Sequence, residues 1–213
     1  MFVKVCCIAS HDEARLAVSA GASAIGLVSA MPSGPGPIPE ELIAEIAARV
    51  AAPTETFLLT ALTDAEAIAE QHRRCGTTAL QLVDQVPEAE LIRLRRLLPG
   101  VRLVQVIHVQ GAHSVEEARA TAPRVDTLLL DSGNPGLAVK ELGGTGRVHD
   151  WAHSRRICEM ASVPVLLAGG LNPGNAHAAI EQVRPTGLDV CSGLRTEGRL
   201  DPGKLRAFFQ AIH

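Results

Sequence analysis

Aromatic residues are nearly absent from this chain of 213 residues, which contains four Phe, one Trp and no Tyr. Hydrophobic residues still make up 46% of the sequence, so the core must be built from Ala, Val, Ile and Leu. Such a composition is typical of buried parallel strands covered by Ala-rich helices. A chain of this length can bury about 70% of its unfolded surface as one domain.

A large net charge, long apolar runs and a spacing of residues typical of metal ligands are also lacking. The formal net charge is −3, and no Lys/Arg cluster with interleaved aromatics occurs, so we expect no nucleic-acid partner. The apolar runs are interrupted before membrane-spanning length and no signal peptide is visible, so we expect no membrane association. The five Cys residues are scattered and odd in number. We therefore expect reduced thiols, no metal and a cytoplasmic protein, whose oligomeric state the sequence does not indicate.

Short aliphatic segments alternate regularly with helical, charge-striped segments. The predicted strands are residues 2–8, 24–29, 55–60, 79–83, 102–109, 126–131, 164–168 and 187–191. Helix start signals lie between them, such as Ser10 with Glu13 as a capping box, and Asn172 followed by Pro173. This alternation predicts parallel strands joined by right-handed crossovers.

Eight such units can close into a barrel or form an open doubly wound sheet. The even spacing of the units favours closure, and no G-x-G-x-x-G follows the first predicted strand as a dinucleotide-binding sheet would require. We therefore predict a single-domain (β/α)8 TIM barrel over residues 1–213, with the open sheet as the alternative.

In such a barrel, chemistry is carried at the carboxyl ends of the strands. That rule selects Cys6 and Asp131, a thiol and a carboxyl group that can both transfer protons. Lys4 has the same strand parity as Cys6, so its charge could lower the thiol pKa. The alternatives are a small buried Cys6 and an Asp131 that caps a turn. Cys7 has the opposite parity and is expected to pack against helices.

Gly-rich turns follow the last two predicted strands. The first contains Gly169 and Gly170, and the second contains Ser192 and Gly193. Backbone amides at such turns favour an anion, and these two loops are where barrels commonly bind phosphate. We therefore predict a phosphorylated small-molecule substrate here, although the glycines could simply permit tight turns.

The long segment 132–149 is a third candidate, because long loops at this face are often functional. It contains Gly144, Thr145 and Gly146, which could form a lid, a phosphate-binding turn or an ordinary flexible loop. His108 and His149 also fall near the predicted mouth, where each could act as an acid or base or be structural.

The strand-end motifs resemble those of the phosphoribosylanthranilate isomerase family of tryptophan biosynthesis. They are VKVCCI, LLLDS, GGTGRVHDW, LLAGGLNPGNAHAAI and GLDVCSGL. The resemblance implies an intramolecular oxidoreductase that catalyses an Amadori rearrangement of an N-linked ribose 5-phosphate. Asp131 would then be the general acid and Cys6 the general base, and the two Gly-rich loops would hold the phosphate. No cofactor is implied, because the substrate nitrogen acts as the electron sink.

The chain departs from that family pattern where the aromatic acid would bind. Pro35 replaces the arginine that contacts the anthranilate carboxylate, and Val83 replaces a histidine. Cys7 replaces a glycine, and Arg195 replaces a glutamate and is a candidate substitute for the missing charge. Three functions stay open: the family reaction, the same chemistry on another phosphosugar amine, and a non-catalytic phosphate-ligand-binding barrel.

Overall fold

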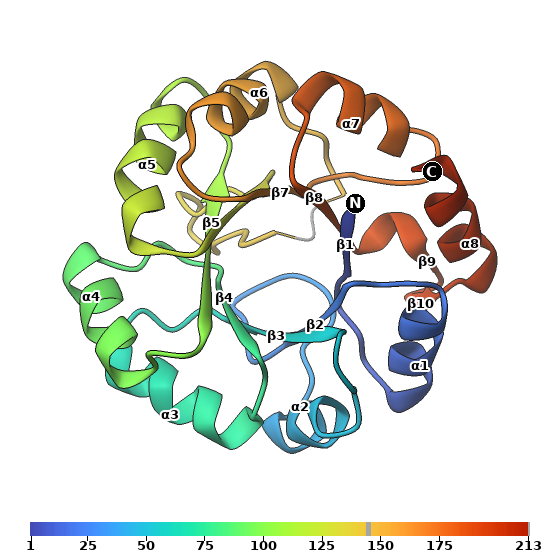
Figure 1. The fold of residues 1–213 in the computed structure, drawn as a ribbon, viewed down its shortest axis with the longest axis horizontal. Coiled ribbons are helices and arrows are strands. Elements are labelled where there is room, and N and C mark those ends of the chain that lie inside the picture. The colour runs from blue at the N-terminus through green and yellow to red at the C-terminus, as the bar shows by residue number, and fades with distance from the viewer. Residues whose placement is uncertain (144–145, 213) are drawn as a thin grey trace.

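Eight parallel strands form a closed barrel in a computed structural model that describes residues 1–143 and 146–212. Each strand pairs with the next in sequence order, and β8 pairs with β1 to complete the ring (Figure 1). The strands are β1 (Phe2–Val5), β2 (Ala24–Val28), β3 (Glu55–Thr60), β4 (Ala79–Leu82), β5 (Arg102–His108), β6 (Thr127–Asp131), β7 (Val165–Leu167) and β8 (Gly187–Val190). The predicted (β/α)8 barrel is confirmed and the open sheet is wrong.

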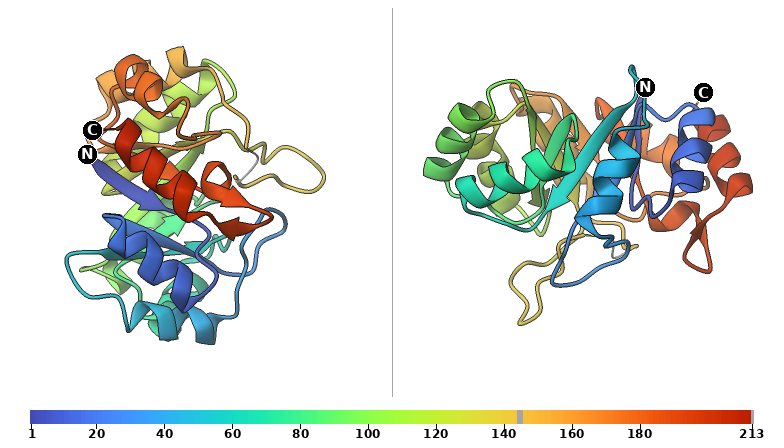
Figure 2. Two further views of the ribbon diagram at one scale, coloured as in Figure 1. Left: turned by 90° about the vertical axis from the view of Figure 1, so that its right-hand side faces the viewer. Right: turned by 90° about the horizontal axis from the view of Figure 1, so that it is seen from below.

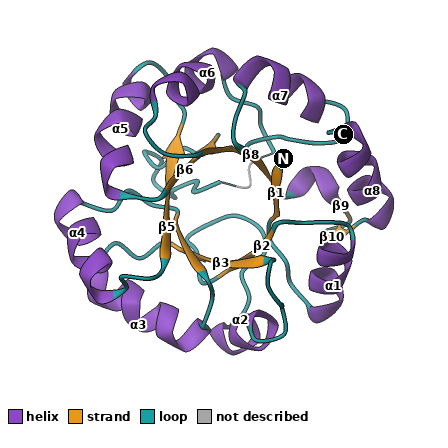
Figure 3. Cartoon of the chain, in the orientation of Figure 1, coloured by secondary structure: helices purple, strands orange, loops and turns teal. Residues whose placement is uncertain are grey.

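Helices surround the barrel and cover the outer face of the strands (Figure 3). They are α1 (His11–Ser19), α2 (Glu40–Ala47), α3 (Ala65–Cys75), α4 (Glu88–Leu97), α5 (His113–Thr121), α6 (Trp151–Met160), α7 (Ala176–Val183) and α8 (Pro202–Ala211). Two short 3₁₀ helices, η1 (Ala122–Arg124) and η2 (Ser192–Leu194), and a hairpin of β9 (Arg195–Thr196) and β10 (Arg199–Leu200) complete the described fold.

Strand side chains divide between two cores, because successive residues of a strand point to opposite faces. Outward-facing aliphatic residues such as Val5, Leu58 and Leu130 are fully buried beneath the helices. A second, smaller cluster fills the interior of the barrel and includes Phe57 and Leu129. The outer face therefore provides most of the apolar packing, and the interior leaves room for polar residues near the carboxyl ends.

Some helices begin where the sequence predicts and others do not. At α1 the backbone N–H of Glu13 donates to the hydroxyl of Ser10 over 3.2 Å, as the capping signal requires. The predicted start at Asn172 and Pro173 is wrong, because α7 begins at Ala176. The Asn172 side chain instead accepts the N–H of Gly174 at 2.9 Å and closes a turn before the helix.

Two long loops extend from the carboxyl ends of the strands on the same side of the molecule. Figure 2 shows the loop after β2, in blue, and the loop after β6, in yellow, projecting together from the barrel. Ser33 in the first loop donates its hydroxyl hydrogen to the carbonyl of Lys140 in the second, at 2.5 Å. The two loops therefore contact each other beside the mouth of the barrel.

None of the helices in the described parts of the chain is long and apolar enough to cross a membrane.

Candidate active site

A pocket opens at the carboxyl ends of the strands. Side chains and backbone from the ends of β1, β2, β3, β4, β6, β7 and β8 line it, together with residues of the two long loops. Both Cys6 and Asp131 line this pocket. The fold therefore brings into one cavity a thiol and a carboxyl group that lie far apart in the sequence.

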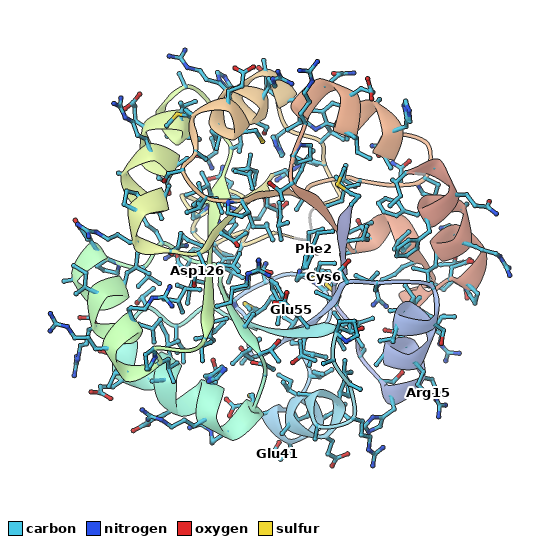
Figure 4. All side chains as sticks on the ribbon, viewed as in Figure 1. Phe2, Cys6, Arg15, Glu41, Glu55 and Asp126 are labelled. Carbon is cyan, nitrogen blue, oxygen red and sulfur yellow. The ribbon has the colours of Figure 1, made fainter. Side chains whose placement is uncertain are left out.

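Cys6 lies inside the ring of strands, whereas Arg15 and Glu41 mark the helical perimeter (Figure 4). It follows the last residue of β1, and its N–H still donates to the carbonyl of Val190 on β8, at 2.8 Å. Only 5% of its surface is exposed. A Cβ placed on Gly26 of β2 would lie 2.7 Å from the Cys6 sulfur, so the space that Cys6 occupies exists because residue 26 has no side chain.

A buried ion pair lies beneath the pocket. Lys4, which is fully buried, donates to the carboxylate of Asp189 at 2.7 Å, and the two are register partners on neighbouring strands. The Lys4 ammonium also lies 5.7 Å from the centre of the Phe57 ring. Burial alone would lower the pKa of Lys4, but the charges of Asp189 and Cys6 raise it above its ordinary value. The raised pKa and the bond to Asp189 therefore favour the charged form of Lys4 beside the thiol.

The surroundings of Cys6 favour its thiolate form. A hydrogen bond from the thiol of Cys7 has the largest effect and lowers the pKa of Cys6. Burial opposes ionisation, and the positive charge of Lys4 lowers the pKa further. The net direction is downward, so Cys6 is a stronger candidate for a proton-accepting thiolate than an isolated cysteine.

Asp131 ends β6 and faces the same pocket. One carboxyl oxygen accepts the backbone N–H of Ser132 at 2.7 Å. The other lies 2.4 Å from the position that a Cβ on Gly143 would take, so the loop after β6 passes directly over this carboxyl group. The carboxyl group is thereby fixed in orientation, with the loop as its cover.

The Gly-rich turns after β7 and β8 form one wall of the pocket. Gly169 and Gly170 both line it with positive φ values of 83° and 65°, which glycine adopts without strain. Ser192 lines it as well, and a Cβ on Gly146 would lie 3.4 Å from the Ser192 hydroxyl. These backbone segments and this hydroxyl thus line the same pocket. The predicted Gly144 and Thr145 lie outside the described residues.

Gly193, also predicted to bind phosphate, lies where the turns after β7 and β8 meet. It is not among the described residues that line the pocket. A Cβ there would lie 1.9 Å from the carbonyl oxygen of Leu171, so the absence of a side chain lets the two turns pack together. The glycine therefore allows the turn that carries Ser192 to pack closely against the turn after β7.

Arg195, which was expected to contact substrate, binds groups of the protein itself. Its guanidinium donates to both carboxylate oxygens of Glu13 at 3.0 Å and to the carbonyl oxygens of Cys6 and Cys7. It is not among the described residues that line the pocket. The expectation that it contacts substrate therefore has no support in the geometry, because Glu13 already satisfies the charge.

The expectation for Cys7 is wrong. Its side chain lines the pocket, and its sulfur lies 2.7 Å from that of Cys191 after β8. Strand parity does not apply at this position because β1 ends at Val5 and Cys7 has a φ of 61°, in the left-handed region. The sequence alone gave no signal for this reversal other than the glycine of the resembling family.

The two histidines near the mouth have structural contacts. His108 bonds through Nε2 to the carbonyl of Val83 at 2.9 Å, and His149 through Nε2 to the hydroxyl of Ser154 at 2.6 Å. Neither is among the described residues that line the pocket, and burial lowers the pKa of His149. Their contacts fix the ends of β5 and α6 beside the pocket.

Two further pocket residues were not selected from the sequence. Asp189 and Gln81 lie at inward positions of β8 and β4, and both line the pocket. Gln81 is 4% exposed, and its amide oxygen has no hydrogen-bond partner among the described residues. The available signal was a polar residue at inward parity within an aliphatic strand. Such a residue is costly to bury unless it binds something.

Much of the remaining pocket lining is apolar. Pro35, Val83, Val28, Met31, Leu59 and Leu142 line it. None of the lining residues within the described ranges is a Lys or an Arg. Within the same ranges no group of His, Cys, Asp and Glu side chains could hold a metal ion.

The fold and the site define a (β/α)8-barrel protein whose reactive groups converge at the carboxyl ends of the strands. Comparison with known proteins narrows this class. A family model described as N-(5'-phosphoribosyl)anthranilate (PRA) isomerase matches residues 3–211. The chain therefore belongs to the N-(5'-phosphoribosyl)anthranilate isomerase family, an isomerase family of tryptophan biosynthesis. The family and the isomerase class expected from the strand-end motifs are confirmed.

Individual relatives of known family match this chain over almost its whole length. The N-(5'-phosphoribosyl)anthranilate isomerase of Desulforudis audaxviator is 38% identical over 98% of this chain and 96% of its own length. The crystal structure of the Thermotoga maritima enzyme superposes with a TM-score of 0.84 at 26% identity, covering 100% of this chain and 98% of the other. A phosphoribosyl anthranilate isomerase in complex with reduced 1-(o-carboxyphenylamino)-1-deoxyribulose 5-phosphate shares the fold, with a TM-score of 0.83 at 22% identity and coverage of 100% and 98%.

Proposed function

We propose that this chain converts N-(5'-phosphoribosyl)anthranilate to its 1-amino-1-deoxyribulose 5-phosphate isomer, with Asp131 as general acid and Cys6 as general base. One observation carries the assignment of roles. Cys6, Asp131 and the turns at Gly169–Gly170 and Ser192 all line a single pocket. The family relationship supplies the reaction, and this convergence supplies the residues.

The first step opens the sugar ring. Asp131 donates a proton to the ring oxygen while the bond between that oxygen and C1 breaks. The electron pair of the anilino nitrogen forms the C1–N double bond of a Schiff base. The Ser132 N–H bond leaves the second oxygen of Asp131 to face the cavity beneath Gly143, so this oxygen is the proposed donor.

The second step moves a proton from carbon. The Cys6 thiolate removes the C2 proton, and the electrons flow into the Schiff base to give an enolamine, which tautomerises to the amino ketone. One proton is given to the substrate and one is taken from it, so substrate and product have the same composition. Lys4 below the thiol stabilises its negative charge before transfer.

The phosphate group would be held by the turns after β7 and β8, the two strands that lie between β6 and β1 in the ring. Glycine backbone at Gly169 and Gly170 allows N–H groups to approach an anion closely, and the Ser192 hydroxyl can donate as well. Anchoring the phosphate would hold the sugar between Cys6 and Asp131. This positioning contributes to the rate because the reacting groups are already in the geometry that the reaction needs. No cofactor enters these steps, because the substrate nitrogen provides the electron pair.

A second candidate substrate follows from the apolar lining of the pocket. The chain has Pro35 where the family has a carboxylate-binding arginine, and none of the described lining residues is cationic. Loss of such a charged contact costs about 1.5–3 kcal/mol of binding. A phosphoribosyl amine with an uncharged aglycone would not incur this cost. A higher kcat/KM for such a compound than for phosphoribosylanthranilate would favour the second candidate.

Complementation of a tryptophan auxotroph that lacks this isomerase tests the proposal. The wild-type chain and Cys158→Ser, a change on α6, should restore growth. Cys6→Ala and Asp131→Asn should fail, and in vitro each should lose about 100-fold or more in kcat/KM. Soluble wild-type protein that neither rescues growth nor turns over phosphoribosylanthranilate would overturn the proposal for this substrate.

Binding of inorganic phosphate tests the proposed anion site separately from catalysis. Phosphate at millimolar concentration should raise the Tm of the wild-type protein and of Asp131→Asn, and raise that of Ser192→Ala less. The proposal also includes a cytoplasmic location, which cell fractionation can check.

A further inference from the structure

Three thiols meet at one side of the substrate pocket. Cys6 and Cys7 follow β1, Cys191 follows β8, and all three line the cavity. The sulfur atoms of Cys7 and Cys191 are 2.7 Å apart. Ordinary van der Waals contact between heavy atoms begins at about 3.5 Å. These two sulfurs are therefore closer than packing alone would place them, with the Cys191 S–H directed at Cys7.

The backbone at Cys7 is arranged to direct its side chain toward Cys191. Its φ of 61° lies in the region that non-glycine residues rarely adopt. The family pattern has glycine here, the residue that adopts this conformation without strain. The opposite loop also makes room, since a Cβ on Gly36 would lie 2.7 Å from the Cβ of Cys7. Because this conformation is strained for a cysteine, we expect its side chain to have a functional role.

Neighbouring strands hold the two cysteines together. Val5 on β1 lies two residues before Cys7, and Val190 on β8 lies directly before Cys191. The two valines are register partners in the closed barrel. The N–H of Cys6 donates to the carbonyl of Val190 and continues the pairing beyond the strand end. The left-handed turn at Cys7, two residues beyond that pair, then brings its sulfur to 2.7 Å from the Cys191 sulfur, so the two sulfurs need only a small approach to form an S–S bond of about 2.05 Å.

We propose that Cys7 and Cys191 are a modification site, where a reversible disulfide forms inside the substrate pocket upon reaction with a hydroperoxide. The formation of this bond does not depend on the isomerase reaction, so the inference goes beyond the proposed function. It uses two residues that the proposed mechanism leaves without a chemical step.

The oxidation balances in two steps. Cys191 loses its thiol proton and its sulfur attacks one oxygen of hydrogen peroxide; the O–O bond breaks, a sulfenic acid forms, and the departing hydroxide takes up that proton as the first water. The Cys7 sulfur then attacks the Cys191 sulfur, the S–O bond breaks, and the hydroxyl group leaves as water with the Cys7 proton. Two thiols and one peroxide thus give one disulfide and two waters. A dithiol reductant returns both thiols by exchange.

The bond would act on the isomerase through Cys6, a consequence that rests on the proposed function. The groups facing the Cys6 thiol are the Cys7 thiol, the Lys4 ammonium and the Asp189 carboxylate. Oxidation removes the Cys7 S–H, the donor that most lowers the pKa of Cys6. The acid limb of the kcat/KM profile should then move to higher pH, and the activity of the oxidised protein near neutrality should fall severalfold.

Peptide mapping tests the bond itself. The purified protein is treated with hydrogen peroxide, its remaining thiols are blocked, and it is digested without reduction. We expect a peptide linked through Cys191 in the wild type, in Cys6→Ser and in Cys158→Ser, with the loss of two hydrogen atoms per chain. The linked peptide should be absent from Cys7→Gly and Cys191→Ser, and dithiothreitol should release it.

The variants separate this disulfide from its alternatives. Cys7→Gly restores the family residue at a left-handed position, so it should fold and serve as the main negative control. A linked peptide that persists in Cys7→Gly but disappears in Cys6→Ser would overturn the assignment to Cys7. Irreversible oxidation of Cys6 with no linked peptide would overturn it as well.

The mapping is independent of turnover, so failure of the isomerase proposal would leave its result intact. Only the activity measurement on the oxidised protein depends on that proposal. A quantitative Cys7–Cys191 bond that leaves kcat/KM and its pH profile unchanged would refute the coupling to Cys6.

Discussion

Gly26 shows how one missing side chain supports the chemistry of the site. It lies on β2, beside β1, in the interior of the barrel. A Cβ at this position would lie 2.7 Å from the Cys6 sulfur and 3.1 Å from the Lys4 nitrogen. Both groups are buried and ordered by other contacts, so neither can withdraw cheaply. The proposed base and its cation therefore depend on a residue that provides space.

Gly26→Ala should reduce activity more than stability. We expect a destabilisation of about 1–3 kcal/mol from overpacking, together with a larger loss of kcat because Cys6 is displaced. Gly100→Ala is the matched control, because nothing lies within 4 Å of a Cβ there. Denaturant unfolding and steady-state kinetics check both variants. Wild-type kinetics in Gly26→Ala would contradict this account of Cys6 placement.

Lys4→Met should leave Asp189 as a buried carboxylate without its ion-pair partner. Breaking such a pair costs about 3–5 kcal/mol, measurable as a fall in the free energy of unfolding. The pKa of Cys6 should also rise, because the Lys4 charge helps lower it. The acid limb of kcat/KM should therefore move to higher pH.

The double variant Lys4→Met with Asp189→Leu separates these two effects. It should recover much of the stability, since no buried charge is left unpaired. It should not recover the wild-type pH profile. A double variant with wild-type kinetics would show that Lys4 has only a structural role.

At the scale of elements, Glu13 of α1 joins segments from both ends of the chain. Its carboxylate accepts from the backbone N–H of Ala9, from that of Leu200 and from Arg195, whose side chain is 9% exposed. Burial opposes ionisation of Glu13, but these hydrogen bonds hold its pKa below the usual value. The loop that carries Cys6 and Cys7 is thereby attached to the β9–β10 hairpin.

Glu13→Gln should destabilise the protein by about 2 kcal/mol at neutral pH, because Arg195 loses its charged partner. The lowered pKa means that this stabilisation is present above the unfolded-state pKa of about 4.3 and is lost as the pH falls through the folded-state pKa. The difference between wild type and variant should therefore shrink in acid. Urea unfolding across this pH range checks it.

Glu116→Gln, on the exposed surface of α5, is the control and should change little. A Glu13→Gln effect that is equal at neutral and acid pH would indicate that the charge of Glu13 is not involved.

At the scale of the whole molecule, one ion pair links the segments that follow β4 and β6 at the carboxyl ends of the strands. Lys140 in the loop after β6 donates to the carboxylate of Asp84 after β4, at 2.5 Å. Leu142 and Gly143 of the same loop line the pocket, and Gly143 covers Asp131. The position of this cover therefore depends partly on a contact with a distant unit.

Lys140→Met should weaken substrate binding without affecting the core. Lys140 is 47% exposed, and an exposed pair contributes up to about 1 kcal/mol, so kcat/KM should fall by up to about 5-fold. The change should appear mainly in KM, and Tm should be nearly unchanged. Arg119→Gln, an exposed change on α5, is the control. A fall in kcat alone would indicate a different role for the loop.

The sequence by itself determined the barrel and the position of its mouth. Local patterns carry this information, because aliphatic runs and capping residues specify strands and helices, and strand order then fixes which ends meet. The motifs ending β1, β6, β7 and β8 were readable for the same reason. They placed Cys6, Asp131 and the Gly-rich turns at one face before any contact was known.

Only the tertiary structure decided the contacts between distant segments. Lys4 and Asp189 are 185 positions apart in the sequence, and no local pattern links them. Parity predicted the wrong face for Cys7, because the chain leaves the strand at Val5 and turns into a left-handed conformation. Arg195 was expected at the substrate but is bound by Glu13 from the opposite end of the chain. Closure of the ring brings β8 against β1, and that single non-local event creates the first and the last of these arrangements.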